Sequence, residues 1–185
     1  MKPKEITVQP LLDSRHGLCP GCGAAMAMAH VLSIVTSPLP SGKTKRIRSA
    51  VIPASCWSIG SGWGGTSFIG TNLVNTPFIA GSTVGEGISI MSERNGLADD
   101  ELTIVWAGDG ASFDIGLGLL SGAAIRTADI LYVINDNQTY GNTGASTRSR
   151  VMPASVGVRN RCKNASVRSR LPVIVMNSWP LPAYR

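Results

Sequence analysis

Two short, compact apolar runs rich in β-branched residues lie in the middle of the chain, at 102–106 and 130–134. Runs of this length and composition are typical of strands buried on both faces of a parallel sheet. The apolar stretch between them, over 115–125, has the length of a helix, so residues 102–134 are predicted to form one βαβ unit. The pattern favours an α/β fold with a mostly parallel, doubly wound sheet and helices on both faces.

Further elements are predicted on both sides of this unit. They are a helix over 24–35, a short strand over 50–55, a glycine-rich loop over 60–65, a helix over 82–94 and a strand over 171–176. Gly85 and Gly87 lie inside the second of these helices, where glycine costs about 1 kcal/mol relative to alanine. Either close packing or a nearby ligand would explain them.

Composition limits the class of protein. The chain has 185 residues, 43% of them hydrophobic, and a mean hydropathy of +0.14, which predicts one packed domain and excludes disordered and fibrous classes. No apolar run reaches about 18 residues, and the first ten residues contain Lys2, Lys4 and Glu5, so we expect neither a membrane span nor a secretory signal. A cytoplasmic location is therefore expected.

The net charge of +6 is unevenly distributed. All 11 acidic residues lie within 1–136, together with 9 of the 17 lysines and arginines, whereas 137–185 contains only basic charges. The body of the chain is mildly acidic, which argues against a nucleic-acid-binding domain. We expect a domain over 1–145 and an atypical basic tail over 146–185, disordered over 146–170 because it lacks an apolar period.

Polar and glycine residues follow the two central strands directly. Gly108-Asp109-Gly110 follows the first, and Asn135 to Tyr140 follows the second. Ligands of open parallel sheets bind beyond the carboxyl ends of the strands, where glycines let backbone N–H groups approach a phosphate. A carboxylate beside a diphosphate requires a cation, and Mg²⁺ accepts carboxylate, amide and phosphate oxygens. Either motif alone is more often an ordinary turn or polar loop, but their combination across one βαβ unit is more specific because it places both at one sheet edge.

The runs 108–116 and 136–144 closely resemble the β subunit of the 2-oxoacid:ferredoxin oxidoreductases, the family of pyruvate synthase. The resemblance implies the thiamine diphosphate-binding fold. It makes Asp109, the Asn137 side chain and the Thr139 carbonyl the Mg²⁺ ligands. It makes Gly110 and Ala111 contacts of the diphosphate and Gly108 a further cofactor-binding residue. It places Asn142 beside the reacting centre as the candidate catalytic residue.

Four cysteines in a chain without a signal peptide indicate metal or redox chemistry. Cys19 and Cys22 form a Cys-x-x-Cys pair that alone fits a zinc half-site, a redox pair or chance. The resemblance adds Cys56 and makes these three residues ligands of a [4Fe–4S] cluster. Cys162 is expected to be a free thiol, because the family's fourth ligand lies far downstream in a longer chain.

The resemblance predicts an enzyme subunit that oxidatively decarboxylates pyruvate or a related 2-oxoacid to acyl-CoA and CO₂, passing electrons to the cluster and to ferredoxin. Expected partners are an α subunit, with γ and δ subunits as further candidates, as well as ferredoxin, a 2-oxoacid and coenzyme A, but neither nucleic acid nor membrane. A nonredox thiamine diphosphate-dependent decarboxylase fragment and a cluster- or zinc-binding interaction module are the alternatives. Because the resemblance ends near Gly144, we expect a truncated or frameshifted tail, or else a basic extension that docks on a partner.

Overall fold

A five-stranded parallel sheet forms the centre of the computed structural model, which describes residues 12–38, 42, 44–62, 67–137, 139–140, 146–147 and 173–177. The strand order is β2-β1-β3-β4-β7, and every neighbouring pair is parallel. The strands are β1 (Arg46–Pro53), β2 (Asn72–Thr76), β3 (Glu101–Gly108), β4 (Ile130–Asp136) and β7 (Val173–Asn177). Two short strands, β5 (Thr139–Tyr140) and β6 (Ser146–Thr147), form a separate antiparallel pair.

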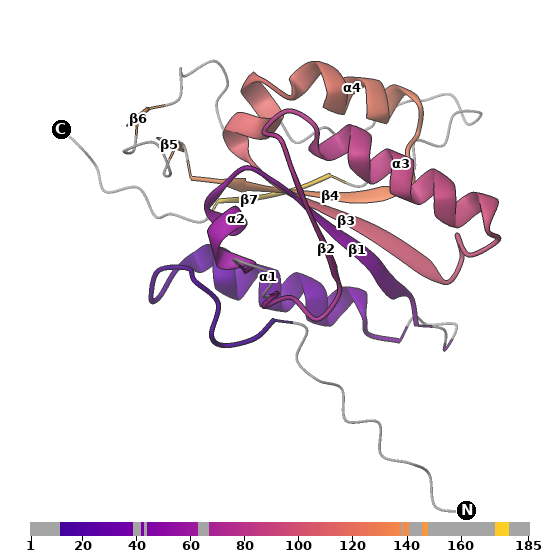
Figure 1. Cartoon of the computed structure of the whole chain (residues 1–185), viewed down its shortest axis with the longest axis horizontal. Helices are drawn as coiled ribbons and strands as arrows, with labels where there is room; N and C mark the ends of the chain where they lie inside the picture. The colour runs from indigo at the N-terminus through magenta and orange to yellow at the C-terminus, as the bar shows by residue number, and fades with distance from the viewer. Residues whose placement is uncertain are drawn as a thin grey trace, which may run out of the picture.

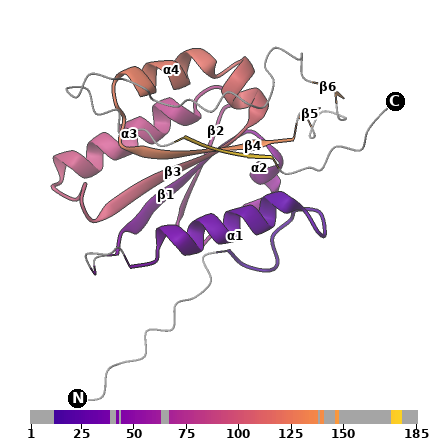
Figure 2. The ribbon, with the colours of Figure 1, turned by 180° about the vertical axis from the view of Figure 1, so that it is seen from behind.

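Helices cover both faces of the sheet (Figures 1 and 2). Helices α1 (Gly23–Val35) and α2 (Cys56–Gly60) lie on one face, and α3 (Gly81–Arg94) and α4 (Leu117–Ile125) lie on the other. A π-helical turn, η1 (Gly110–Asp114), connects β3 to α4. The predicted α/β class, with a parallel sheet between two helical layers, is confirmed. In the part of the chain that the structure describes, no helix is long and apolar enough to cross a membrane.

The two layers enclose two hydrophobic cores, one on each face of the sheet. Met28, Val31 and Leu32 of α1 pack with Trp57 and Trp106 on the first face. Side chains of α4 and alternate strand residues fill the second core, which contains Val51, Val105, Leu120, Ala123, Tyr132 and Ile134. Because both faces are covered, β3 and β4 are almost continuously apolar, which is why the sequence identified them.

Several boundaries differ from the predictions. Strand β1 begins at Arg46 rather than residue 50, and β2 was not predicted, because this half-exposed edge strand has no apolar period and depends on pairing with β1. Gly60, expected in a loop, ends α2. A reciprocal cap starts this helix, in which the Ser55 backbone N–H donates to Ser58 Oγ at 2.9 Å.

Close packing explains two of the glycines. A Cβ on Gly85 would lie 2.4 Å from Val105 Cγ2, so the packing interpretation applies to Gly85, while Gly87 has open space around it. A Cβ on Gly116 would lie 1.8 Å from the Ala111 carbonyl oxygen. The backbone that enters α4 therefore requires glycine at this position, since no side chain fits beside the π-helical turn.

Four side chains form a charged cluster where β3 begins. Glu101 is 4% exposed, and its carboxylate accepts hydrogen bonds from Arg48 at 2.7 Å and from Ser92 at 2.8 Å, and also pairs with Arg46. Hydrogen bonds from Arg48 and Arg46 lower the pKa of Glu101 from 4.5 to about 2. This acidic residue is therefore charged and fully engaged at neutral pH.

Most of the expected basic tail lies outside the described residues. The predicted disorder over 146–170 can be compared with the structure only at Ser146–Thr147, which form β6 rather than a disordered segment. Strand β7, which was expected at 171–176, is described and pairs with β4 from Tyr132↔Val173 to Asp136↔Asn177. Residues beyond 145 thus contribute an edge strand to the same sheet.

Candidate active site

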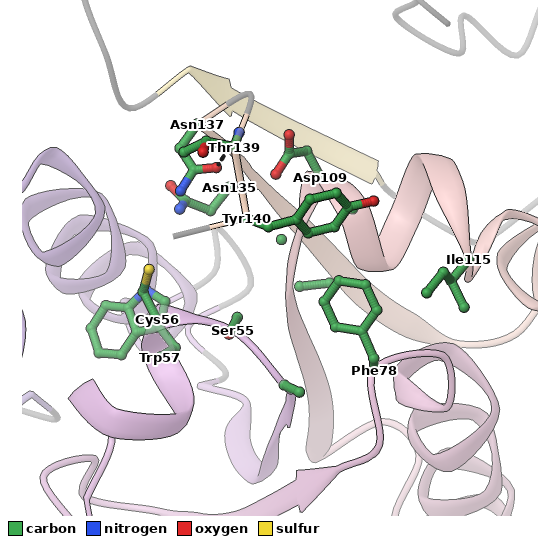
Figure 3. A pocket seen from close by; sticks show the side chains of 14 residues that line it. Ser55, Cys56, Trp57, Phe78, Asp109, Ile115, Asn135, Asn137, Thr139 and Tyr140 are labelled. Atoms are coloured by element: carbon green, nitrogen blue, oxygen red, sulfur yellow. Dashed lines mark hydrogen bonds between the residues drawn. The ribbon is translucent and has the colours of Figure 1, made fainter. Parts of the chain in front are cut away.

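A cavity of about 420 Å³ lies at the carboxyl ends of β1, β3 and β4 (Figure 3). It is lined by Ala54, Ser55, Cys56, Trp57, Phe78, Ala107, Gly108, Asp109, Gly110, Ile115, Asn135, Asn137, Thr139 and Tyr140. Its position is the one predicted for a ligand of an open parallel sheet. Strands β3 and β4 end together because Gly108 is the register partner of Asn135.

The Gly-Asp-Gly motif forms one wall of the cavity. Asp109, which is 3% exposed, directly follows β3. Gly110 lies so close to an aromatic ring that an added Cβ would be 2.3 Å from Tyr140 Cε1. Ser112 closes the π-helical turn by donating a hydrogen bond to the Gly108 carbonyl at 2.7 Å. The backbone of this motif is therefore held tightly against the cavity.

The segment after β4 forms the facing wall. The Thr139 N–H donates to Asn137 Oδ1 at 3.1 Å, a turn characteristic of asparagine that orients the amide and the following backbone. The Tyr140 hydroxyl donates to Asp114 Oδ2 at 2.5 Å, and the Tyr140 ring lies 5.9 Å from that of Phe78. Tyr140 thus connects this segment to the π-helical turn across the cavity wall.

The charge of the lining supports a cation site. Among the described residues around the cavity, Asp109 carries the acidic group, and none is lysine, arginine or histidine. An anionic ligand beside Asp109 would require a positive ion between them. Asp109 and Asn137 offer carboxylate and amide oxygens, which suit Mg²⁺. This donor set fits the predicted metal.

Cys56, at the start of α2, lines the same cavity, so the structure brings it to the predicted diphosphate residues. Burial raises the pKa of the Cys56 thiol, and the charges of nearby Cys22 and Cys19 raise it further. The three cysteines are therefore close enough to interact electrostatically. Within the described segments, no three His, Cys, Asp or Glu side chains are grouped to hold one metal ion.

The structure brings some of the predicted site residues to the cavity and leaves others outside its lining. The cavity gathers Gly108, Asp109, Gly110, Asn137, Thr139 and Cys56. Cys22 is half-buried and Cys19 is exposed, both outside the cavity lining, and Ala111 is buried behind it. Asn142 and Cys162 lie outside the described residues.

Sequence reasoning gave no role to Phe78, Ile115, Asn135 or Tyr140, all of which line the cavity. Phe78 and Ile115 had no signal, since their place depends on how β2, α3 and η1 pack. Asn135 did have a signal in the sequence, because it is a polar residue that continues a fully buried strand.

The sequence profile described as thiamine pyrophosphate enzyme, C-terminal TPP binding domain, matches residues 64–171. The chain therefore belongs to this family, whose cofactor is also called thiamine diphosphate. The matched segment contains the whole Gly-Asp-Gly and Asn137 region. The cysteine motif and Cys56 precede it.

Individual relatives carry more specific names. The chain is 37% identical over 138 residues to ketoisovalerate oxidoreductase subunit VorB of Pyrococcus furiosus, covering 72% of this chain and 42% of that one. It is 31% identical over 144 residues to pyruvate synthase subunit PorB of Methanosarcina barkeri, and this match covers 75% of this chain and 44% of that one. The chain thus spans less than half the length of these relatives.

One solved structure has the same fold. It is a 2-oxoglutarate:ferredoxin oxidoreductase from Magnetococcus marinus with 2-oxoglutarate, coenzyme A and succinyl-CoA bound. The match has a TM-score of 0.54 and 23% identity, and it covers 78% of this chain and 46% of that chain. It supports the predicted sheet and helix arrangement.

Proposed function

We propose that the chain is the thiamine diphosphate-binding part of a ferredoxin-dependent 2-oxoacid oxidoreductase of the pyruvate synthase type. The carrying observation is that Asp109, Asn137 and Cys56 all line one cavity. The first two residues suit a metal-bound diphosphate, and the third is the cysteine that a nonredox thiamine enzyme would not need. The names of the relatives agree with this combination.

The residues after β3 and β4 would hold the cofactor. Asp109, the Asn137 amide and the Thr139 carbonyl would bind Mg²⁺, while the backbone at Gly108, Gly110 and Ala111 would receive the diphosphate. Bound thiamine diphosphate supplies the carbanion chemistry by which a 2-oxoacid loses CO₂. The chain's contribution is to neutralise the diphosphate through the metal and to fix its position. Asn142 remains the candidate residue beside the reacting centre.

The cysteines would supply the electron acceptor. Cys19, Cys22 and Cys56 are proposed ligands of a [4Fe–4S] cluster, whose thiolates bind different iron atoms and stand further apart than the ligands of one ion. The Cys22 N–H donates to the Cys19 carbonyl at 3.1 Å, and both residues are near enough to Cys56 to raise the pKa of its thiol, which supports this assignment. Electrons released at the cavity would then have a short path to the cluster and from there to ferredoxin.

Part of the site would come from other subunits. Ile115 lines the cavity and yet is 54% exposed, and Leu117 beside it is also exposed. Apolar side chains at a cavity mouth are typical of a surface that another protein covers. We propose an α subunit there, with coenzyme A and a 2-oxoacid such as pyruvate as substrates. The complex would act in the cytoplasm.

Metal and cofactor analysis of the anaerobically purified full chain tests the proposal. We expect bound iron, an absorption band near about 400 nm, and Mg²⁺-dependent binding of thiamine diphosphate. Thiamine diphosphate binding without iron would indicate a nonredox thiamine enzyme. Stoichiometric zinc without thiamine diphosphate binding would indicate an interaction module.

A further inference from the structure

One buried polar side chain of the cavity has no role in the proposed metal or cluster site. Asn135 is 7% exposed, lies next to the last residue of β4, and lines the cavity. Its Oδ1 has no hydrogen-bond partner among the described residues. Figure 3 shows its amide among the cavity side chains, drawn between Asn137 and the pair formed by Cys56 and Trp57.

An amide at this position is unexpected for the fold alone. Alternate residues of a strand share a face, so Asn135 continues the column of Leu131 and Val133, which pack in the core with Trp57 and Trp106. An apolar residue would extend that core. Leaving a buried acceptor without a donor destabilises the folded chain, so the free protein does not benefit from asparagine here.

We propose that Asn135 is a cofactor-contacting residue whose Oδ1 accepts a hydrogen bond from the amino group on the pyrimidine ring of thiamine diphosphate. This inference rests on the proposed function. The missing partner is either a cation or an N–H or O–H donor. The proposed Mg²⁺ already has Asp109, Asn137 and Thr139 as ligands, and neither a diphosphate nor a 2-oxoacid anion donates a hydrogen bond. The amino group of the cofactor is such a donor. Asn135 lies one pleat before Asn137, on the side of the cavity formed with Cys56.

Opposite effects on stability and binding distinguish this role from a structural one. We expect Asn135→Leu to raise the melting temperature of the cofactor-free full chain, since the orphaned acceptor is removed. We expect it also to weaken thiamine diphosphate binding about tenfold, the size of one lost hydrogen bond. A variant that lost both stability and affinity would show that Asn135 only supports the strand and would overturn the proposal.

Thr103→Val is the matched control. Thr103 lies in β3, is 2% exposed, and has a hydroxyl without a partner among the described residues, but it does not line the cavity. This variant should gain stability and keep the wild-type affinity. Asn135→Ala, which adds no volume, repeats the binding measurement in case leucine does not fit.

An analogue of thiamine diphosphate without the pyrimidine amino group tests the assigned contact. Calorimetric titration with Mg²⁺ gives the ratio of analogue to cofactor dissociation constants for each chain. We expect this ratio to be about tenfold smaller in the Asn135 variants than in the wild type. An unchanged ratio would overturn the contact while leaving the proposed function intact. A wild-type chain that bound neither compound would instead refute the proposed function, and the inference with it.

Discussion

Strand β3 has a buried acidic residue at each end, and the two ends have opposite surroundings. Glu101, where the strand begins, contacts Arg46, Arg48 and Ser92. Asp109, directly after the strand, is equally buried but lies on the wall of a cavity whose described lining contains no lysine, arginine or histidine. Burial alone therefore does not distinguish a structural carboxylate from a binding one. In the proposed site, a bound metal ion would add positive charge beside Asp109, whereas Arg46 and Arg48 of the chain supply it at Glu101.

The largest effect is expected at the cavity end. Asp109→Ala should reduce Mg²⁺-dependent thiamine diphosphate binding by more than about 100-fold, because the carboxylate that balances the metal is lost. Asn137→Ala should weaken binding less. Calorimetric titration of the full chain measures both. Asp109→Asn keeps the side-chain shape, and Asp129→Ala, which lies before β4 and away from the cavity, is the control. Unchanged affinity in the Asp109 variants would refute the metal site.

The second prediction concerns the three proposed cluster ligands. Replacement of Cys19, Cys22 or Cys56 by serine should remove most of the bound iron, because a cluster rarely survives the loss of a thiolate ligand. Binding of thiamine diphosphate should be largely retained. Iron analysis and calorimetry on the same anaerobic preparations separate the two effects. If iron were retained in all three variants, the cluster would have to be assigned to other residues.

A substitution at Glu101, where β3 begins, should change the stability of the fold but not cofactor binding. Glu101→Gln removes the charge that Arg46 and Arg48 share, and should lower the melting temperature by roughly 5 °C without affecting cofactor binding. The folded-state pKa of about 2 is below the ordinary value of 4.5. The stabilisation is therefore complete above pH 4.5 and is lost as the pH falls toward 2.

Unfolding of the wild type and of Glu101→Gln across this pH range measures that contribution. The two proteins should converge in stability as the wild-type carboxylate becomes protonated. A constant difference between them would show that shape, rather than charge, determines the effect of the substitution.

The smallest effect is expected where the protein only positions the metal ligands. Tyr140→Phe removes the hydrogen bond to Asp114 but retains the ring against Phe78. The Mg²⁺ affinity should fall a few-fold because Asn137 and Thr139 become less fixed. Tyr132→Phe, which removes a buried hydroxyl near Ser112 outside the cavity lining, should leave Mg²⁺ affinity unchanged. An equal loss of Mg²⁺ affinity in both variants would indicate a general effect on stability rather than a positioning role for Tyr140.

The cavity end was easier to predict from sequence than the charged end. Gly108-Asp109-Gly110 and Asn137 follow apolar strands directly, so a local pattern placed them at one sheet edge. The Glu101 cluster joins residues from positions 46 to 101, which only the folded sheet and α3 bring together. Within the cavity, Asn135 belongs to the polar segment that follows the second apolar run, but only the folded structure shows that its oxygen has no partner among the described residues.

The π-helical turn has a consequence for the phase of the helix that follows it. The Ile115 N–H donates to the Gly110 carbonyl at 3.2 Å, five residues back rather than four. This turn therefore contains one residue more than an α-helical turn would. Deleting a single residue within 110–114 would rotate α4 by about 100° relative to β3. Leu120 and Ala123 would then point away from the sheet. One residue of chain length thus couples the ligand-binding end of β3 to the packing of an entire helical layer.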